Sequence, residues 1–522
     1  MESIKENYEL LIFLSGSKAF TKRITLKPSD MLLLGIDLGS SSVKASVIEG
    51  ETGKCLATAF HPSDEMKIIA LKPGWAEQDT EIWWKNLKAS ISDCTARLGQ
   101  KKNDIGAIGI SYQMHGLVAV DKSNNPVRPS IIWCDSRAVT YGEKALNSLG
   151  KEFCLLHLLN SPGNFTASKL AWVKENEPEL FGRIHRIMLP GDYIALRLTG
   201  EISTSYTGLS EGIFWDFANN RVSQELMKYF GFDLKILPEA FPSFSTHGTL
   251  LQSVASELGL PEGIPVSYRA GDQPNNALSL NVLNPGEVAA TAGTSGVIYG
   301  VTDKKKYDPL SRVNTFLHVN HSQAETRLGV LLCINGTGIL NSWLRRNISG
   351  NLSYNDMNDI AEKVAPGSDG LSVLPFGNGA ERMLGNKDTG AQISGLNFNR
   401  HTGANLFRAA QEGVAFSFRF GLDIMKETGI DPEVIRAGEA NMFLSKVFRE
   451  TLSTITGISI QLYNTDGSIG AARGAGIGCG YYKSEKEAFK GLNEVGITEP
   501  VKSKSTDIEE AYLKWKNLLL SL

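Results

Sequence analysis

One sequence pattern occurs twice in this chain, and the repetition limits the folds that are open to it. The first copy, MLLLGIDLGSSSVKASVIE, starts at Met31 and runs from an apolar strand through a turn of glycine and serine into a second strand. The second copy, EVAATAGTSGVIYG, starts at Glu287 and has the same order. Such segments are typical of β-hairpins. Two similar hairpins so far apart predict two lobes that are built alike.

Strand-like and helix-like segments alternate between and after the two copies. AIGISY, PSIIWC and GIPVSYRAG read as strands, and stretches such as IWWKNLKASISDCTARL read as helices. This alternation predicts an α/β fold. No G-x-G-x-x-G sequence opens a helix after the first strand, which argues against a simple dinucleotide-binding fold. We expect a lobe boundary near residues 281–287, which gives an N-terminal extension over 1–30 and lobes over 31–281 and 282–522.

Residues 1–30 differ in character from the rest of the chain. They are polar and mixed, and they end in KPSD just before the first strong strand pattern. We expect Met31 to be the true start. An intact-mass measurement that finds residues 1–30 in the native protein would contradict this expectation.

Composition and charge exclude two classes of protein. Hydrophobic residues make up 42% and charged residues 21% of the 522 residues, which is typical of a folded protein and not of a disordered one. The 53 Lys and Arg residues nearly balance the 56 Asp and Glu residues, and no basic block occurs. We therefore expect no nucleic-acid partner.

Apolar runs and cysteines indicate the compartment. No apolar run approaches the roughly 18 residues of a membrane span, and LLIFL near the N-terminus is too short for a secretory signal. The six cysteines lie far apart without a C-x-x-C pair, which argues against zinc and a disulfide scaffold. We expect a cytoplasmic protein with no membrane partner, and the sequence leaves open whether it forms a homodimer.

The turns of the two hairpins have the residues of phosphate-binding loops. Asp37 ends the first strand and is followed by Gly39, Ser40, Ser41, Ser42 and Lys44. Backbone N–H groups and hydroxyls in such a turn can face a phosphate, and Asp37 can hold a hydrated Mg²⁺. Gly293, Thr294 and Ser295 form the corresponding turn of the second copy. Either turn alone also fits an ordinary polar hairpin, but two such loops from two lobes can clamp one polyphosphate.

Asp272 and Gln273 follow a strand-like segment in the sequence GDQPNN, and two interpretations fit them. Either residue can cap a helix that has Pro274 in its first turn. An ionised Asp272 can also accept the proton of a substrate hydroxyl during phosphoryl transfer. The two roles are compatible.

Gln113, Met114 and His115 follow the strand AIGISY, and ligands of α/β sheets bind beyond the carboxyl ends of strands. A carboxamide and a neutral imidazole can orient a polyol through hydrogen bonds. A structural histidine bonded to the backbone is the alternative for His115. Asp135 and Arg137 follow PSIIWC in a similar way, and for these we favour a helix cap.

Two segments of the second lobe are candidates for nucleotide binding. In VIRAGEANMFLSKVF, Gly438 lies between a strand and a helix, and Asn441 lies near the helix start. A glycine there lets a flat ring approach the backbone, although a plain turn is the alternative. The sequence DGSIGAARGAGIGCG over residues 466–480 predicts a helix of small residues, which suits close packing or a position beside a nucleotide.

Taken in order, these segments resemble the signatures of a known family. GIDLGSSSVK, YQMHGLV, GDQ, AGTSGV, AGEAN and GAARGA, together with TASKLAWVKEN, are similar to those of the FGGY carbohydrate kinases over roughly residues 31–490. The resemblance implies a two-lobed, actin-like and hexokinase-like ATPase fold, with duplicated ribonuclease H-like lobes and the active site in the cleft between them. QMHG resembles the xylulokinase branch. The implied reaction is the phosphorylation of D-xylulose to D-xylulose 5-phosphate with ATP and Mg²⁺, in pentose catabolism.

The resemblance also implies roles for single residues. Asp272 would be the catalytic base, and Asp37 would serve the metal and the phosphates. Gln113, Met114, His115 and Gln273 would bind the sugar together with Asp272. The residues that would line the nucleotide are Gly39, Ser40, Ser41, Ser42, Lys44, Gly293, Thr294, Ser295, Gly336, Gly438 and Asn441.

Some positions depart from the family pattern, and two other functions stay open. Glu439 stands where many members have a further glycine, and Gln411, Asn164 and residues 381–388 also differ. The nearer alternative is a kinase for ribulose, rhamnulose, gluconate or glycerol, because a few pocket residues decide the substrate within one fold. The more distant one is a non-enzymatic ATP switch, which would need neither Asp272 nor a sugar pocket.

Overall fold

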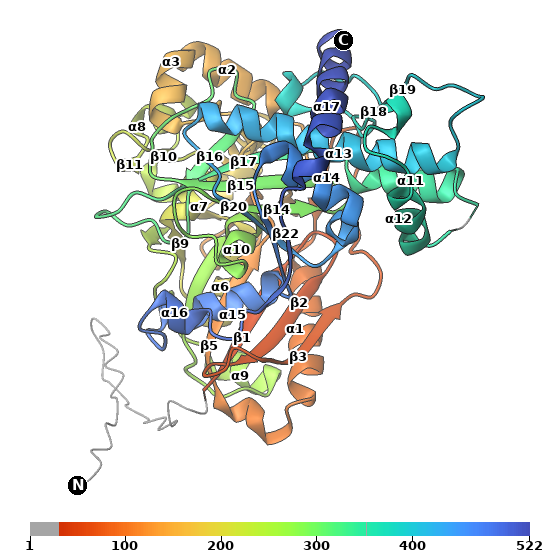
Figure 1. The fold of residues 1–522 in the computed structure, drawn as a ribbon. Helices are drawn as coiled ribbons and strands as arrows, with labels where there is room; N and C mark the ends of the chain where they lie inside the picture. Colours follow the sequence, from red (N-terminus) through yellow and green to blue (C-terminus); the bar gives the residue numbers. More distant parts are fainter. Residues whose placement is uncertain (1–30, 351) are drawn as a thin grey trace.

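Two mixed β-sheets form the centres of two lobes, and helices cover them (Figure 1). The computed structural model describes residues 31–350 and 352–522. The prediction about the native start concerns residues 1–30, which lie outside the described residues. The expected α/β alternation is confirmed, because strands and helices succeed one another along both lobes.

The first sheet has the strand order β13-β5-β1-β2-β3. Its strands are β1 (Leu32–Leu38), β2 (Val43–Glu49), β3 (Cys55–His61), β5 (Ile105–Tyr112) and β13 (Val266–Gly271). β1 pairs antiparallel with β2 and parallel with β5, and β5 pairs parallel with β13. In this register Tyr112 lies beside both Leu38 and Gly271. The chain segments that follow β1, β5 and β13 therefore leave the sheet together at one edge.

The second sheet has the order β16-β17-β15-β14-β20-β21-β22. Its strands are β14 (Glu287–Ala292), β15 (Gly296–Thr302), β16 (Asn314–Leu317), β17 (Leu328–Ile334), β20 (Val434–Gly438), β21 (Ile460–Tyr463) and β22 (Glu494–Thr498). β14 pairs antiparallel with β15 and parallel with β20, as β1 does with β2 and β5. The predicted second copy of the hairpin is confirmed.

The helices of both halves and the remaining short strands complete the fold (Figure 1). Up to residue 281 the helices are α1 (Thr80–Ala96), α2 (Val139–Leu149), α3 (Lys151–Phe153), α4 (Thr166–Asn176), α5 (Pro178–Arg183), α6 (Pro190–Thr199), α7 (Tyr206–Glu211), α8 (Gln224–Phe230), α9 (Gln252–Leu258) and α10 (Asp272–Ser279). After it they are α11 (Gly338–Asn347), α12 (Tyr354–Glu362), α13 (Gly403–Glu427), α14 (Lys446–Thr456), α15 (Gly467–Gly478), α16 (Glu485–Ala488) and α17 (Ser505–Leu520). The short strands are β4 (Glu77–Gln78), β6 (Val118–Val120), β7 (Ser130–Ile131), β8 (Arg186–Met188), β9 (Ser203–Ser205), β10 (Trp215–Asp216), β11 (Arg221–Val222), β12 (Glu239–Phe241), β18 (Ser372–Leu374) and β19 (Gln392–Ser394). Within the part of the chain that the structure describes, no helix has the length and apolar character of a membrane span.

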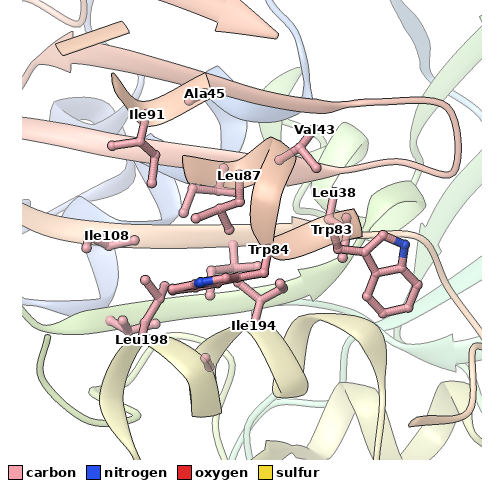
Figure 2. Close-up of a cluster of buried hydrophobic side chains, with 14 of the residues drawn as sticks. Leu38, Val43, Ala45, Trp83, Trp84, Leu87, Ile91, Ile108, Ile194 and Leu198 are labelled. Atoms are coloured by element: carbon pink, nitrogen blue, oxygen red, sulfur yellow. The ribbon is translucent and has the colours of Figure 1, made fainter. Parts of the chain in front are cut away.

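Helix α1 holds the first hairpin in place. Its buried side chains pack between the sheet and α6, and the cluster in Figure 2 contains Trp83, Trp84, Leu87, Ile91, Leu38, Val43, Ala45, Ile108, Ile194 and Leu198. Burial of each large apolar side chain stabilises the fold by roughly 1.5–3 kcal/mol. Because Leu38 and Val43 flank the turn between β1 and β2, the packing fixes both ends of that turn.

Helix α15 comes from the C-terminal part of the chain but packs on the first sheet (Figure 1). A Cβ on Gly35 of β1 would lie 1.8 Å from the carbonyl oxygen of Ser468, and one on Gly109 of β5 would lie 1.9 Å from that of Ala471. Only glycine allows so close an approach. The predicted helix of small residues is confirmed, and close packing accounts for its composition.

Candidate active site

A cavity opens where β1, β5 and β13 end. It has a volume of about 330 Å³, and its lining residues are Asp37, Gly39, Ser40, Ser41, Ser42, Lys44, Gln113, Trp133 and Asp272. The sequence predicted all of these as site residues except Trp133, a half-exposed indole. The cavity thus joins the first predicted phosphate loop to the predicted base and to one predicted sugar-binding residue.

The predicted phosphate loop of the first hairpin is held to helix α15 by hydrogen bonds. The Gly39 N–H donates to the Ser42 carbonyl oxygen at 3.0 Å, which closes the turn. The Lys44 Nζ donates to Asp466 Oδ2 at 2.5 Å. Asp466 Oδ1 in turn accepts the N–H groups of Ser468 and Ile469 and caps α15. Burial opposes the ionisation of Asp466, but Lys44 and these hydrogen bonds lower its pKa overall.

Asp37 and Asp272 share the cavity, and the charge of Asp37 makes Asp272 harder to ionise. Asp37 is the last but one residue of β1, and burial and the nearby Asp466 carboxylate raise its pKa, against the opposing effects of Ser111 and Lys44. Asp272 begins α10, and burial together with the charge of Asp37 raises its pKa to about 7. Gly271 is the N-cap residue of α10 and no side chain caps the helix, so the alternative that Asp272 or Gln273 is the helix cap is wrong.

The predicted sugar-binding loop after β5 lies beside this cavity. Gln113 lines it, whereas Met114, His115 and Gln273 lie outside its lining. Met114 is buried against Gly271, where a Cβ would come within 2.5 Å of its Cγ. The His115 ring contacts Phe165 edge-on with 4.8 Å between ring centroids. Its Nδ1 lies 3.0 Å from the Glu211 carbonyl oxygen, which agrees with the alternative of a histidine bonded to the backbone.

Gln78 joins the predicted phosphate loop to the predicted sugar-binding loop, and the sequence analysis missed it. Its Nε2 donates to the Ser40 carbonyl oxygen at 2.7 Å, and its Oε1 accepts from Gln113 Nε2 at 3.1 Å. Trp83 Nε1 also donates to that Oε1 at 2.9 Å. Gln78 is buried, so each of these bonds is protected from water. Gln78 stands between Glu77 and Asp79 in a polar stretch, where no periodic pattern marks it in advance.

The second hairpin turn is held by the start of α11. Thr337 Oγ1 donates to the carbonyl oxygens of Gly293 and Thr294 at 3.0 and 3.1 Å. Asn441 Nδ2 lies 3.6 Å from the place of a Cβ on Gly293, so β14 and β20 bring the predicted nucleotide residues Gly293, Gly438 and Asn441 to one edge. These residues, with Thr294, Ser295 and Gly336, do not line the 330 Å³ cavity.

Glu381 is a second residue that the sequence analysis missed. It belongs to the stretch that departs from the family pattern, and it is fully buried. Its carboxylate accepts the N–H of Asn335 at 2.9 Å and that of Gly336 at 3.1 Å. Burial raises the pKa of Glu381 to about 7, although these N–H groups oppose the shift. Glu381 thereby fixes the loop that leads into α11.

The expected helix cap at Asp135 is wrong. Helix α2 has Ala138 as its N-cap residue, without a side-chain cap. Asp135 is instead fully buried, where its Oδ2 accepts from Arg137 Nη2 at 2.6 Å and from the Ala76 N–H at 2.6 Å. The local ion pair with Arg137 and the hydrogen bond from the distant Ala76 N–H engage the Asp135 carboxylate in the interior, so it does not cap the helix.

Comparison with known proteins assigns the two halves to one family. Residues 32–279 match the N-terminal domain of the FGGY family of carbohydrate kinases, and residues 288–479 match its C-terminal domain. The two matches cover most of the chain. They occur in the order that the resemblance implied.

Single relatives and solved structures agree with this assignment. The xylulose kinase of Lactococcus lactis subsp. lactis is 28% identical over 503 residues, which cover 93% of this chain and 96% of that protein. That of Bacillus subtilis is 28% identical over 464 residues, 87% of this chain and 90% of that protein. The crystal structure of xylulose kinase from Rhodospirillum rubrum superposes with a TM-score of 0.85 at 25% identity and covers 94% of this chain and 99% of that one.

Two structures with other substrates in their names share the fold. The gluconate kinase of Lactobacillus acidophilus is 21% identical with a TM-score of 0.85, and the ADP-bound glycerol kinase of Plasmodium falciparum is 21% identical with a TM-score of 0.83; each match covers 94% of this chain and 98% of the other. The two-lobed, actin-like ATPase fold is therefore confirmed, whereas the sugar is not decided by fold. From the two domain matches, the chain belongs to the FGGY family of carbohydrate kinases and is an ATP-dependent carbohydrate kinase.

Proposed function

We propose that this kinase transfers the γ-phosphoryl group of ATP to D-xylulose and forms D-xylulose 5-phosphate. The observation that carries the proposal is the cavity in which Asp272 and Gln113 lie with the phosphate loop that follows Asp37. The xylulose kinases among the relatives support D-xylulose over the other sugars of the family. Membership of a kinase family argues against the ATP switch considered as the distant alternative.

Asp272 is the proposed general base. A base works best when its pKa lies near the operating pH, and burial and the charge of Asp37 raise the pKa of Asp272 to about 7. The carboxylate would accept the proton of the primary hydroxyl at C5 as that oxygen bonds to the phosphorus, while the bond from phosphorus to the leaving ADP oxygen breaks. General-base catalysis of this kind contributes on the order of 10²–10⁴ in rate.

The residues in the cavity fit a Mg²⁺ ion that arrives with the nucleotide. Among residues 31–350 and 352–522 no group of three or more His, Cys, Asp or Glu side chains could hold a metal by itself. Mg²⁺ is usually bound by one or two carboxylates together with phosphate oxygens and water. Asp37 would supply the carboxylate, and the ion would neutralise charge on the phosphates.

The two hairpin turns are the proposed phosphate cradle. The N–H groups and hydroxyls of Gly39, Ser40, Ser41 and Ser42, with Lys44, line the first side. Gly293, Thr294, Ser295 and Gly336 would supply the second side, and Gly438 and Asn441 would contact the nucleoside. Phosphoryl transfer passes through a loose, charged transition state, so aligned donors supply most of the catalysis.

ADP release from ATP and Mg²⁺, measured with D-xylulose and with a panel of ribulose, rhamnulose, gluconate and glycerol, tests which sugar the kinase phosphorylates. We expect a strong and selective response to D-xylulose, and a response at least about a hundredfold weaker from Asp272→Asn. A response to a different sugar would keep Asp272 as the base and overturn D-xylulose. A response that does not depend on any sugar would contradict the kinase mechanism.

Two further expectations stay predictions, and one question stays open. The predictions are the lobe boundary between residues 281 and 282 and the cytoplasmic location, and the open question is whether the protein forms a homodimer. Limited proteolysis, cell fractionation and sedimentation analysis would test them in turn.

A further inference from the structure

His115 has a backbone conformation that the rest of the site must enforce. Its φ of 60° lies in the left-handed region, which non-glycine residues seldom adopt and which costs on the order of 1 kcal/mol. His115 nevertheless occupies the sugar-binding loop directly after β5. A neighbouring structure must therefore hold this residue in place.

Glu211 and Lys169 supply that structure through three contacts. The His115 N–H donates to Glu211 Oε1 at 3.3 Å, and His115 Nδ1 lies 3.0 Å from the Glu211 carbonyl oxygen. Lys169 Nζ donates to the His115 carbonyl oxygen at 2.8 Å. Glu211 is 1% and Lys169 0% exposed, so both side chains are fixed by the protein around them. The backbone donor, the backbone acceptor and one ring nitrogen of His115 are thus all engaged from outside its own loop.

This arrangement decides the tautomer of the ring. A carbonyl oxygen can only accept, so Nδ1 carries the proton in its bond to Glu211. Burial lowers the pKa of His115 to about 3, and the charges of Lys169 and Arg382 act in the same direction, so the ring is neutral at physiological pH. Nε2 then has a free lone pair, and within 31–350 and 352–522 it makes no hydrogen bond.

Glu211 also lies close to the segment that carries the proposed base. A Cβ on Gly271 would come within 2.7 Å of Glu211 Oε2, and Gly271 directly precedes Asp272. One buried side chain thus touches the backbone of both the sugar-binding loop and the segment that carries the base. A shift of Glu211 would move the two together.

We propose that Glu211 and Lys169 are positioning residues for the sugar, which hold His115 so that its Nε2 lone pair accepts a hydrogen bond from a substrate hydroxyl. The inference rests on the proposed function, because it takes a polyhydroxylated sugar as the ligand. The proposal also restricts which substrate group can contact Nε2, because that group must be a hydrogen-bond donor. A hydroxyl is a donor, and the carbonyl oxygen of a ketose is not.

The tautomer is measured first, without any substrate. In ¹⁵N-histidine-labelled protein, with His115→Asn to assign the signal among the eight histidines, Nδ1 should appear as a protonated and Nε2 as an unprotonated nitrogen between pH 5 and 8. An Nε2–H tautomer, or a ring that gains a second proton in this range, would overturn the proposal. Because no sugar is added, this result is independent of whether the kinase prefers D-xylulose.

Kinetics then test the role of Glu211 with whichever sugar the enzyme accepts. Glu211→Ala should raise the KM for sugar about tenfold and leave the KM for ATP unchanged, since one buried hydrogen bond to the loop is lost. Glu211→Gln, which keeps the Oε1 acceptor, should restore most of the affinity, and Glu225→Ala on the exposed face of α8 is the control. An unchanged KM for sugar in Glu211→Ala, or an equal rise in both KM values, would overturn the proposal. If the alanine variant fails to fold, Lys169→Met, which removes the donor to the His115 carbonyl oxygen, should raise the KM for sugar alone, and an unchanged KM for sugar would overturn the proposal.

Discussion

Replacement of Asp272 by asparagine should remove activity and at the same time stabilise the protein. Burial and the charge of Asp37 raise the pKa of Asp272 from 3.8 to about 7. The folded state therefore binds the proton more tightly than the unfolded state, and stability falls as the pH rises from about 4 to about 7. Above pH 7 Asp272 is ionised in the folded state as well, and the free energy of unfolding is lowered by the full cost of holding that charge in the site.

The size of this free-energy cost follows from the pKa shift of Asp272. Each pKa unit corresponds to about 1.4 kcal/mol, so three units give about 4 kcal/mol. Asp272 faces a cavity and is only partly buried, so solvent screening reduces the expected gain to about 2 kcal/mol at pH 8. For a lobe of this size, such a gain raises Tm by about 4–8 °C.

Calorimetry at pH 5 and pH 8, without nucleotide or Mg²⁺, measures this effect. The Tm of Asp272→Asn should exceed that of the wild type at pH 8, and the difference should be smaller at pH 5. ADP release with sugar should fall by on the order of 10²–10⁴. A variant that is less stable at both pH values would refute the pKa argument, and retained turnover would refute the assignment of the base.

The remaining predictions concern residues that position the site. Gln78→Ala should lower kcat and raise the KM for both sugar and ATP, because the buried bonds to Ser40 and Gln113 are lost together; an effect on one KM alone would contradict this link. Gly35→Ala should destabilise the protein by more than about 2 kcal/mol in urea unfolding, because its Cβ would displace α15; a wild-type midpoint would count against that packing. Glu381→Ala should raise the KM for ATP, measured by ADP release, and leave the KM for sugar unchanged, because the loop before α11 loses its hydrogen bonds to the Glu381 carboxylate. A change in the KM for sugar alone would disprove this role.

The part of the site that lies at the ends of strands was predictable from the sequence. Asp37, Gln113 and Asp272 each come just after an apolar strand pattern, and parallel pairing of β1, β5 and β13 brings them to one edge. The repeated strand–turn–strand pattern likewise predicted the two sheets. Local patterns sufficed here because strand period and turn chemistry are local properties.

Residues that act through tertiary contacts were not predictable in this way. Gln78 and Glu381 bond to loops that are distant in sequence, and nothing in their own neighbourhoods indicates those partners. The prediction for Asp135 was wrong because its carboxylate is buried, where it accepts from the distant Ala76 N–H as well as pairing with Arg137. The small residues of α15 predicted close packing, but only the fold shows that their partner is the first sheet.

The most direct test of the account is the rate of ADP release with D-xylulose, ATP and Mg²⁺, compared between the wild type and Asp272→Asn. We expect a sugar-dependent rate for the wild type that is at least about a hundredfold lower in the variant, with ATP binding retained in both. A wild-type rate that does not depend on sugar, or a variant that phosphorylates D-xylulose at the same rate, would contradict it.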